Sequence, residues 1–133
     1  KKRISPSKQT SLDLALQCFG LGHDAKNFLT LPRLIEKQLA EPRHYGCAGV
    51  HFAFIACGRT DIYIAAEAAF YDMAAGILLA QEAGLSLSTL DGSRFQIGEK
   101  NTNLVVANKK LLKKYKEVIK RSSINQNILR RFL

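Results

Sequence analysis

The sequence lacks most of the features that mark membrane, fibrous or disordered proteins. It contains no tryptophan, one methionine, three prolines and three cysteines in 133 residues. No apolar run approaches the roughly 20 residues that a transmembrane helix needs, and no internal repeat or low-complexity segment is present. With 47% hydrophobic and 23% charged residues, the chain has the composition of one globular domain with a continuous core.

The cysteines argue against both a disulfide framework and a zinc site. Cys18, Cys47 and Cys57 are odd in number, include no Cys-x-x-Cys pair and have no histidine pair at ligand spacing. The chain does not begin with methionine and shows no secretory signal pattern. We therefore expect a cytoplasmic protein with reduced thiols, no membrane partner and an N-terminus that is not the natural one.

Positive charge is concentrated at one end of the sequence. The formal net charge is +9, and residues 108–133 contain nine Lys or Arg against the single Glu117. Such a basic face can bind nucleic acid, an acidic protein or a phosphorylated ligand. Because no aromatic stacking platform accompanies the charges, we expect a solvated helix face and do not expect nucleic acid as a partner.

Apolar spacing predicts strands that alternate with helices. The Asp91-Gly92 pair between two alternating runs is typical of a tight hairpin turn. Together these patterns predict an α/β domain over residues 1–121, with a mixed β-sheet flanked by helices and its first ten residues frayed. Residues 122–133 are expected to be a basic tail or last helical turns. Strands are expected at 11–20, 60–67 and 102–108, and helices at 28–39, 46–58, 72–83 and 109–120.

Asp72 is the carboxylate with the most specific surroundings. It follows Phe70 and Tyr71 and begins an apolar helix. An aspartate at a helix start accepts hydrogen bonds from first-turn amides and contributes about 1 kcal/mol. A carboxylate with apolar neighbours, however, needs a cation more than it needs amides. Capping and metal ligation are both compatible with this position.

A second candidate site begins the helix expected at 46–58. Gly46, Cys47, Ala48 and Gly49 are small enough for a ligand to approach the backbone amides at a helix start. Close packing against another helix would require the same small residues. The three histidines are not at ligand spacing, and His51, within an apolar helix, is expected to be a satisfied core histidine.

The order of these motifs resembles the second half of the inositol monophosphatase family of magnesium-dependent phosphatases. In that family a Gly-Ser/Thr-Ala-Ala helix start is followed by a turn and strand, Trp-Asp with an Ala/Gly-rich helix, an Asp-Gly hairpin and a strand ending in Ala-Asn. The matching stretches here are "GCAG", "IACGRTDIYI", "YDMAAGILLAQEAG", "LDG" and "LVVAN". The resemblance covers about residues 12–120 and implies the C-terminal domain of the inositol monophosphatase-like sugar phosphatase fold.

The resemblance implies roles for five residues. Asp72 is expected to ligate Mg²⁺, and Arg43, Gly46, Cys47 and Ala48 are expected to form part of the substrate wall. Oxygen ligands and phosphate suit magnesium.

Several family features are replaced or missing in this chain. The family's tryptophan is Tyr71, and its polyol-binding glutamate aligns with Ala65, with Glu67 the nearest acid. The helical glutamate and the Asp-Pro-x-Asp-Gly-Thr motif that hold the other metals are not in the chain. The "STLDGS" segment lacks the first aspartate and the proline of that motif, and we interpret it as a hairpin turn.

These observations predict one part of a phosphatase. We expect a magnesium-dependent phosphomonoesterase acting on inositol phosphate or a related small sugar or nucleotide phosphate, with the N-terminal half of the same protein as partner. No catalytic residue is assigned to this chain, which is expected to be inactive alone, and a homodimer is left open. The alternative is a non-catalytic binding or regulatory module, a degenerate family member that uses its basic C-terminal helix.

Overall fold

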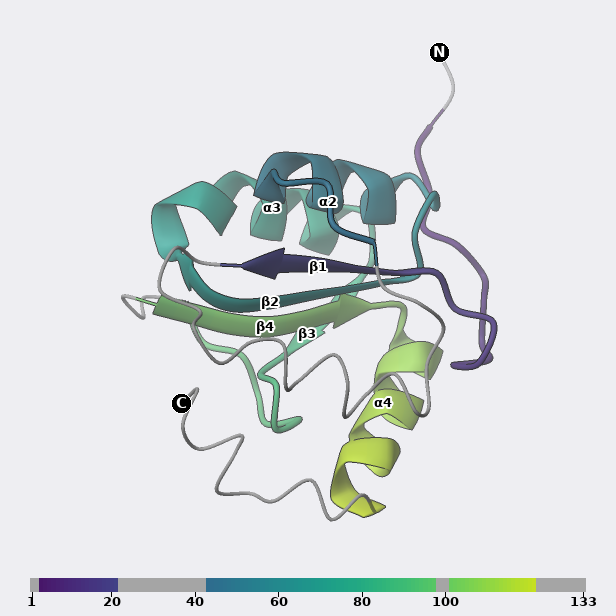
Figure 1. Cartoon of the computed structure of the whole chain (residues 1–133). Coiled ribbons are helices and arrows are strands. Elements are labelled where there is room, and N and C mark those ends of the chain that lie inside the picture. The colour runs from purple at the N-terminus through teal and green to yellow at the C-terminus, as the bar shows by residue number, and fades with distance from the viewer. Residues whose placement is uncertain (1–2, 22–42, 98–100, 122–133) are drawn as a thin grey trace.

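The fold is a mixed four-stranded sheet with helices on both faces (Figure 1). The computed structural model describes residues 3–21, 43–97 and 101–121. The strand order is β1-β2-β4-β3, in which β1 pairs parallel with β2 and the other two pairings are antiparallel. The mixed α/β sheet is therefore confirmed. The strands are β1 (Gln17–Leu21), β2 (Ile62–Ala69), β3 (Ser86–Ser88) and β4 (Asn101–Ala107).

The central strands β2 and β4 are buried on both faces because helices cover each side of the sheet. Alternate side chains therefore enter two different cores. Ile62 and Ile64 of β2 belong to the core beneath one face, whereas Tyr63 and Ala65 belong to the core beneath the other.

The helices α2 (Ala48–Ala56) and α3 (Phe70–Glu82) pack side by side on the Tyr63 face. Their contact is close because Gly76 has no side chain, and a Cβ built on it would overlap the ring of Phe52. Both expected helices are confirmed, although α3 begins two residues earlier than the apolar spacing predicted.

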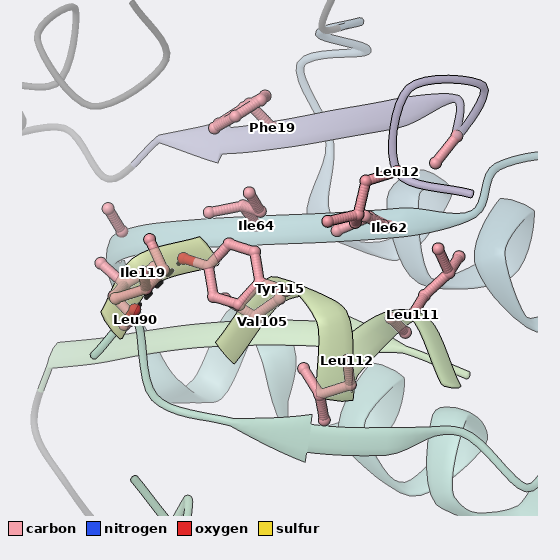
Figure 2. Packing of buried hydrophobic residues seen from close by; sticks show 13 residues of the cluster. Leu12, Phe19, Ile62, Ile64, Leu90, Val105, Leu111, Leu112, Tyr115 and Ile119 are labelled. Atoms are coloured by element: carbon pink, nitrogen blue, oxygen red, sulfur yellow. Dashed lines mark hydrogen bonds between the residues drawn. The ribbon is translucent and has the colours of Figure 1, made fainter. Parts of the chain in front are cut away.

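The helix α4 (Lys109–Arg121) covers the opposite face (Figure 2). Its buried positions recur at three- and four-residue steps, as expected for an amphipathic helix. The Tyr115 hydroxyl donates a hydrogen bond to the Leu90 carbonyl, 3.1 Å away, which ties α4 to the turn after β3. The α4 side chains in this core are Leu111, Leu112, Tyr115 and Ile119.

The first expected strand is correct only in its second half. Leu12 is buried, but Leu14 is 73% exposed, and β1 begins at Gln17. The alternation of leucines across 12–16 therefore belongs to a turn rather than to a strand. The Ala15 amide donates to the Leu12 carbonyl at 3.2 Å, so Leu12 and Ala15 are buried while Asp13 and Leu14 between them are exposed.

The N-terminal segment was expected to be frayed, but its described part makes specific hydrogen bonds. The Ser7 hydroxyl donates to Asp61, and the Asn108 side-chain amide donates to the Ser7 and Gln9 carbonyls. These partners lie 54 to 101 residues away in the sequence, so sequence-local reasoning could not identify them.

The Asp91-Gly92 turn is present, but its second arm is not a strand. Gly92 has a φ of +86°, and the Asp91 carboxylate accepts hydrogen bonds from Thr89 and Ser93. Beyond the turn only one bridge, between Ser88 and Arg94, continues the pairing. The sheet is mixed because β4 runs antiparallel to its neighbours, and not because of this hairpin.

Two of the expected features lie outside the described residues. These are the helix at 28–39 and the tail at 122–133. Among the described helices, none has the length and apolarity needed to cross a membrane.

Candidate functional site

Asp72 and the N-terminus of α3 lie at the end of the sheet where β1 and β2 end, because α3 follows β2 directly. The helix α2 leads into β2, and α3 follows β2 directly, so both helices run back against this strand. The two helices therefore run in the same direction, and the contact between Phe52 and Gly76 shows that they lie side by side. Their N-termini consequently open at the same edge of the sheet.

The segment before α2 is attached to β1 through its backbone. The Arg43 amide donates to the Gln17 carbonyl and the Phe19 amide donates to the Arg43 carbonyl, both at 2.9 Å. Arg43 thereby forms a parallel bridge with Cys18, and its side chain is exposed at the edge of the sheet. Arg43 therefore lies beside the first residues of β1, on the segment that leads into α2.

The start of α2 leaves backbone donors exposed. Gly46 has a φ of +70°, and Cys47 is the N-cap residue, without a side-chain capping hydrogen bond. The first intrahelical hydrogen bond runs from the His51 amide to the Cys47 carbonyl. The amides of Ala48, Gly49 and Val50 therefore have no acceptor within the helix, as is general for the first turn of a helix, where the helix dipole favours negative charge.

Asp72 lies in the first turn of α3 but is not its N-cap. That position belongs to Ala69, so Asp72 is the third helical residue, and the capping interpretation is wrong. Its side chain is exposed and makes no hydrogen bond or ion pair with another residue that the structure describes. A carboxylate here is favoured by the helix dipole and remains available to a ligand.

The Tyr63 side chain packs between the sheet and the helices α2 and α3. Its ring contacts Phe52 at a centroid distance of 4.9 Å, and its hydroxyl lies 3.9 Å from the sulfur of Met73. A Cβ on Gly20 would overlap the Tyr63 hydroxyl, so the glycine at the end of β1 makes room for this side chain. Burial raises the pKa of Tyr63, which keeps the phenol neutral.

His51 is a buried polar residue beside the start of α2, and sequence reasoning did not identify its contacts. It is fully buried, and its Nε2 accepts a hydrogen bond of 3.0 Å from the Tyr45 amide. Its Nδ1 has no hydrogen-bond partner among the described residues, so the expectation of a satisfied core histidine is only half correct. Burial, and then the nearby His44, lower the pKa of His51 to about 4. Its polar position within an apolar helix was the only available sequence signal.

A β-bulge changes the direction of β2 just before α3. The pairing with β4 shifts between Ala65 and Ala68, and Glu67 takes a left-handed conformation with a φ of +52°. Its amide donates to the Asn103 side-chain oxygen at 2.8 Å. Because bulges redirect side chains at sheet ends, Glu67 falls outside the regular alternation of side chains between the two faces of the sheet, which Ala65 follows.

The described residues do not by themselves build a metal centre. No group of three or more His, Cys, Asp or Glu side chains within the described ranges is arranged to hold a metal ion. Tyr71, which replaces the family's tryptophan, is 82% exposed, so its ring is not part of the described core. The described part of the candidate site is therefore two helix N-termini and the exposed Asp72 carboxylate, with the exposed Arg43 on the segment that leads into α2.

This architecture defines the chain's class as a three-layer α/β domain, with a mixed sheet between two layers of helix. Its family follows from comparison with known sequences. The model of the inositol monophosphatase family matches residues 2–124, and the chain belongs to this family.

The relatives include proteins with two different names. The chain is 30% identical over 97 residues to inositol-1-monophosphatase of Caulobacter vibrioides, a match that covers 70% of this chain and 38% of the relative. It is 38% identical over 98 residues to the Nus factor SuhB of Pseudomonas aeruginosa, covering 69% of this chain and 36% of the relative. The chain thus spans well under half the length of these curated relatives.

A solved structure shows the same fold. The extragenic suppressor protein SuhB from Bartonella henselae superposes with a TM-score of 0.75 at 27% sequence identity. The match covers 90% of this chain and 48% of the other. The α/β architecture expected from the motif order is therefore confirmed.

Proposed function

We propose that this chain forms one wall of a magnesium-dependent phosphomonoesterase that acts on inositol phosphate or a related small sugar or nucleotide phosphate. The observation that carries the proposal is the shared edge at which α2 presents unbonded amides and α3 presents the uncommitted Asp72 carboxylate. Membership of the inositol monophosphatase family supports the same reaction class.

Each residue has a distinct proposed task. Asp72 supplies one oxygen ligand, and bound Mg²⁺ would neutralise phosphate charge during transfer to water. Arg43 and the amides around Gly46, Cys47 and Ala48 bind and orient oxygen atoms of the substrate. The exposed carboxylate fits magnesium's preference for oxygen, although a single carboxylate cannot hold the ion in place.

We propose that the remaining ligands come from the N-terminal half of the same cytoplasmic protein. Two observations support a missing partner: the short span relative to family members, and an apolar outer surface on α2 and α3. Val50, Tyr71 and Leu78 are 36%, 82% and 59% exposed on these helices. A homodimer would cover the same surface, and the size of the full-length protein in solution distinguishes the two.

The test is Asp72→Asn in the full-length protein. We expect Mg²⁺-dependent release of phosphate from inositol phosphate to fall by at least about 100-fold, while the thermal unfolding midpoint stays within a few degrees. Asparagine keeps the size of the side chain but loses the charge that holds the cation.

The matched control is Glu82→Gln, which removes an exposed carboxylate from the last turn of the same helix. It is expected to leave turnover unchanged. Full activity in Asp72→Asn would refute the metal-ligand role. Absence of any Mg²⁺-dependent turnover in the unmodified full-length protein would favour the non-catalytic alternative.

A further inference from the structure

Besides its backbone hydrogen bonds to β1 and the 2.7 Å contact of His44 Nδ1 with the Phe19 carbonyl, the segment before α2 packs around one buried histidine, His51. The rings of His44 and Tyr45 lie 5.8 and 5.6 Å from the His51 ring, and Tyr63 lies 4.8 Å from it on the sheet side. The Tyr45 amide donates to His51 Nε2 at 3.0 Å. Gly46 and Cys47 follow immediately, so this hydrogen bond fixes the backbone that enters the helix.

The protonation state of His51 follows from this hydrogen bond. Since Nε2 accepts a proton donor, the neutral ring carries its hydrogen on Nδ1. The lowered pKa, about 4, keeps the ring neutral near physiological pH. An imidazolium would present N–H groups at both nitrogens and could not accept from Tyr45.

His51 is retained at an energetic cost to the core. Its Nδ1 is buried without a partner in the described part of the chain, and an unpaired buried donor is unfavourable. An apolar ring of similar size would avoid this cost, because the ring of His51 already packs against the aromatic rings of Tyr45 and Tyr63. Groups that break a local rule in this way are found at functional positions.

We propose that His51 is a positioning residue whose Nε2 holds the Tyr45 amide and thereby places the Gly46-Cys47 backbone for substrate binding. The substrate part of this inference rests on the proposed function, whereas the positioning part does not. The role is indirect, since His51 is buried behind the segment. Loss of the acceptor should therefore weaken substrate binding more than it slows turnover.

The experiment compares His51→Phe with His51→Gln in the full-length protein. Phenylalanine keeps the ring but has no acceptor, whereas the Gln side-chain oxygen can accept from the Tyr45 amide. In His51→Phe we expect amide exchange at Tyr45 to accelerate at least 10-fold and KM to rise at least 5-fold, with kcat changed less than 2-fold. His51→Gln should retain most of the Tyr45 protection.

Two further measurements separate positioning from a general loss of structure. The exposed Cys47 thiol should react faster with a thiol reagent in His51→Phe, while the half-buried Cys57 at the other end of α2 should react at an unchanged rate. The unfolding midpoint of His51→Phe should be equal to or above that of the unmodified protein, because the unpaired donor is gone.

The outcomes distinguish the two parts of the inference. Unchanged Tyr45 exchange and unchanged Cys47 reactivity in His51→Phe would overturn the positioning role. Faster exchange and reactivity with an unchanged KM would confine the role to local order and overturn the link to substrate. Faster exchange in a protein without Mg²⁺-dependent turnover would uphold positioning while refuting the proposed phosphatase function.

Discussion

Gly46 has a left-handed backbone conformation and directly precedes Cys47, the N-cap of α2. Its φ of +70° lies in the left-handed region, yet no atom lies within 4 Å of a Cβ built on it. A side chain therefore has space, and only the backbone conformation opposes it. Gly84 offers a comparison, because it has a φ of +84° and the same open surroundings at the far end of α3.

We predict that Gly46→Ala and Gly84→Ala each lower the free energy of unfolding by about 1–2 kcal/mol, the cost of a left-handed non-glycine residue. Denaturant unfolding measures this effect. Only Gly46→Ala should also raise KM for the phosphate substrate in the full-length protein, because only Gly46 adjoins the α2 donors. Equal effects of both variants on KM would remove Gly46 from the substrate wall.

At the scale of elements, the close contact of α2 and α3 positions both helix N-termini. Gly76 allows Phe52 to lie against the α3 backbone, and the atoms that a Cβ would overlap include the Phe52 Cβ as well as its ring. The ring cannot simply rotate away from such a contact. The spacing between the helices therefore depends on this glycine.

We predict that Gly76→Ala destabilises the protein by about 1–3 kcal/mol, the usual cost of overpacking a core, although alanine has the better helix propensity. Thermal unfolding of the single variant and of Gly76→Ala with Phe52→Leu tests the cause. The double variant should recover part of the loss. A neutral or stabilised Gly76→Ala would show that the helices separate without cost.

The helix α4 has one face in the core and a second face rich in Lys and Arg whose role the fold does not explain. Its apolar side is used in the core, and its seven Lys and Arg side chains form no ion pair with a described residue. Two of them, Lys109 and Lys110, lie in the first turn, where the helix dipole disfavours cations. The cap from Asn108, whose oxygen accepts from the Lys110 and Leu111 amides at 3.0 Å, stabilises this turn.

We predict that α4 binds short nucleic acid duplexes weakly at low salt and that this binding is lost at physiological salt, as expected for non-specific phosphate contacts. A salt titration of duplex binding measures this. Reversal of charge at the exposed Lys113 and Lys114 should abolish the low-salt binding without changing the unfolding midpoint. Tight, sequence-dependent binding at physiological salt would instead support the regulatory alternative.

At the scale of the whole molecule, no group of three or more His, Cys, Asp or Glu side chains in the described ranges is arranged to hold a metal ion. Phosphoryl transfer assisted by two metal ions about 4 Å apart needs several oxygen ligands that converge on them. We predict that the 133-residue chain alone shows no turnover of inositol phosphate or of a nucleotide bisphosphate with millimolar Mg²⁺. Turnover that survives repurification and disappears in Asp72→Asn would show that the chain is self-sufficient.

The sequence by itself determined the class of the fold and the positions of the candidate residues along the chain. Apolar spacing identified α2, α3, α4 and β4. A helix with one buried face and a strand with two buried faces each have a characteristic spacing of apolar residues along the chain. The order of the motifs identified the family, because each motif is a short continuous stretch that can be recognised without the structure.

Tertiary structure decided which distant residues act together. The shared edge of the α2 and α3 N-termini depends on strand order and on the fit of Phe52 against Gly76. The tie between Ser7 and Asp61 crosses 54 residues. Tyr45 and His51, which share a hydrogen bond, are close in the sequence. The burial that keeps the His51 ring neutral, however, comes from packing against Tyr63 on β2. Burial is a property of the whole assembly, so spacing along the chain does not contain it.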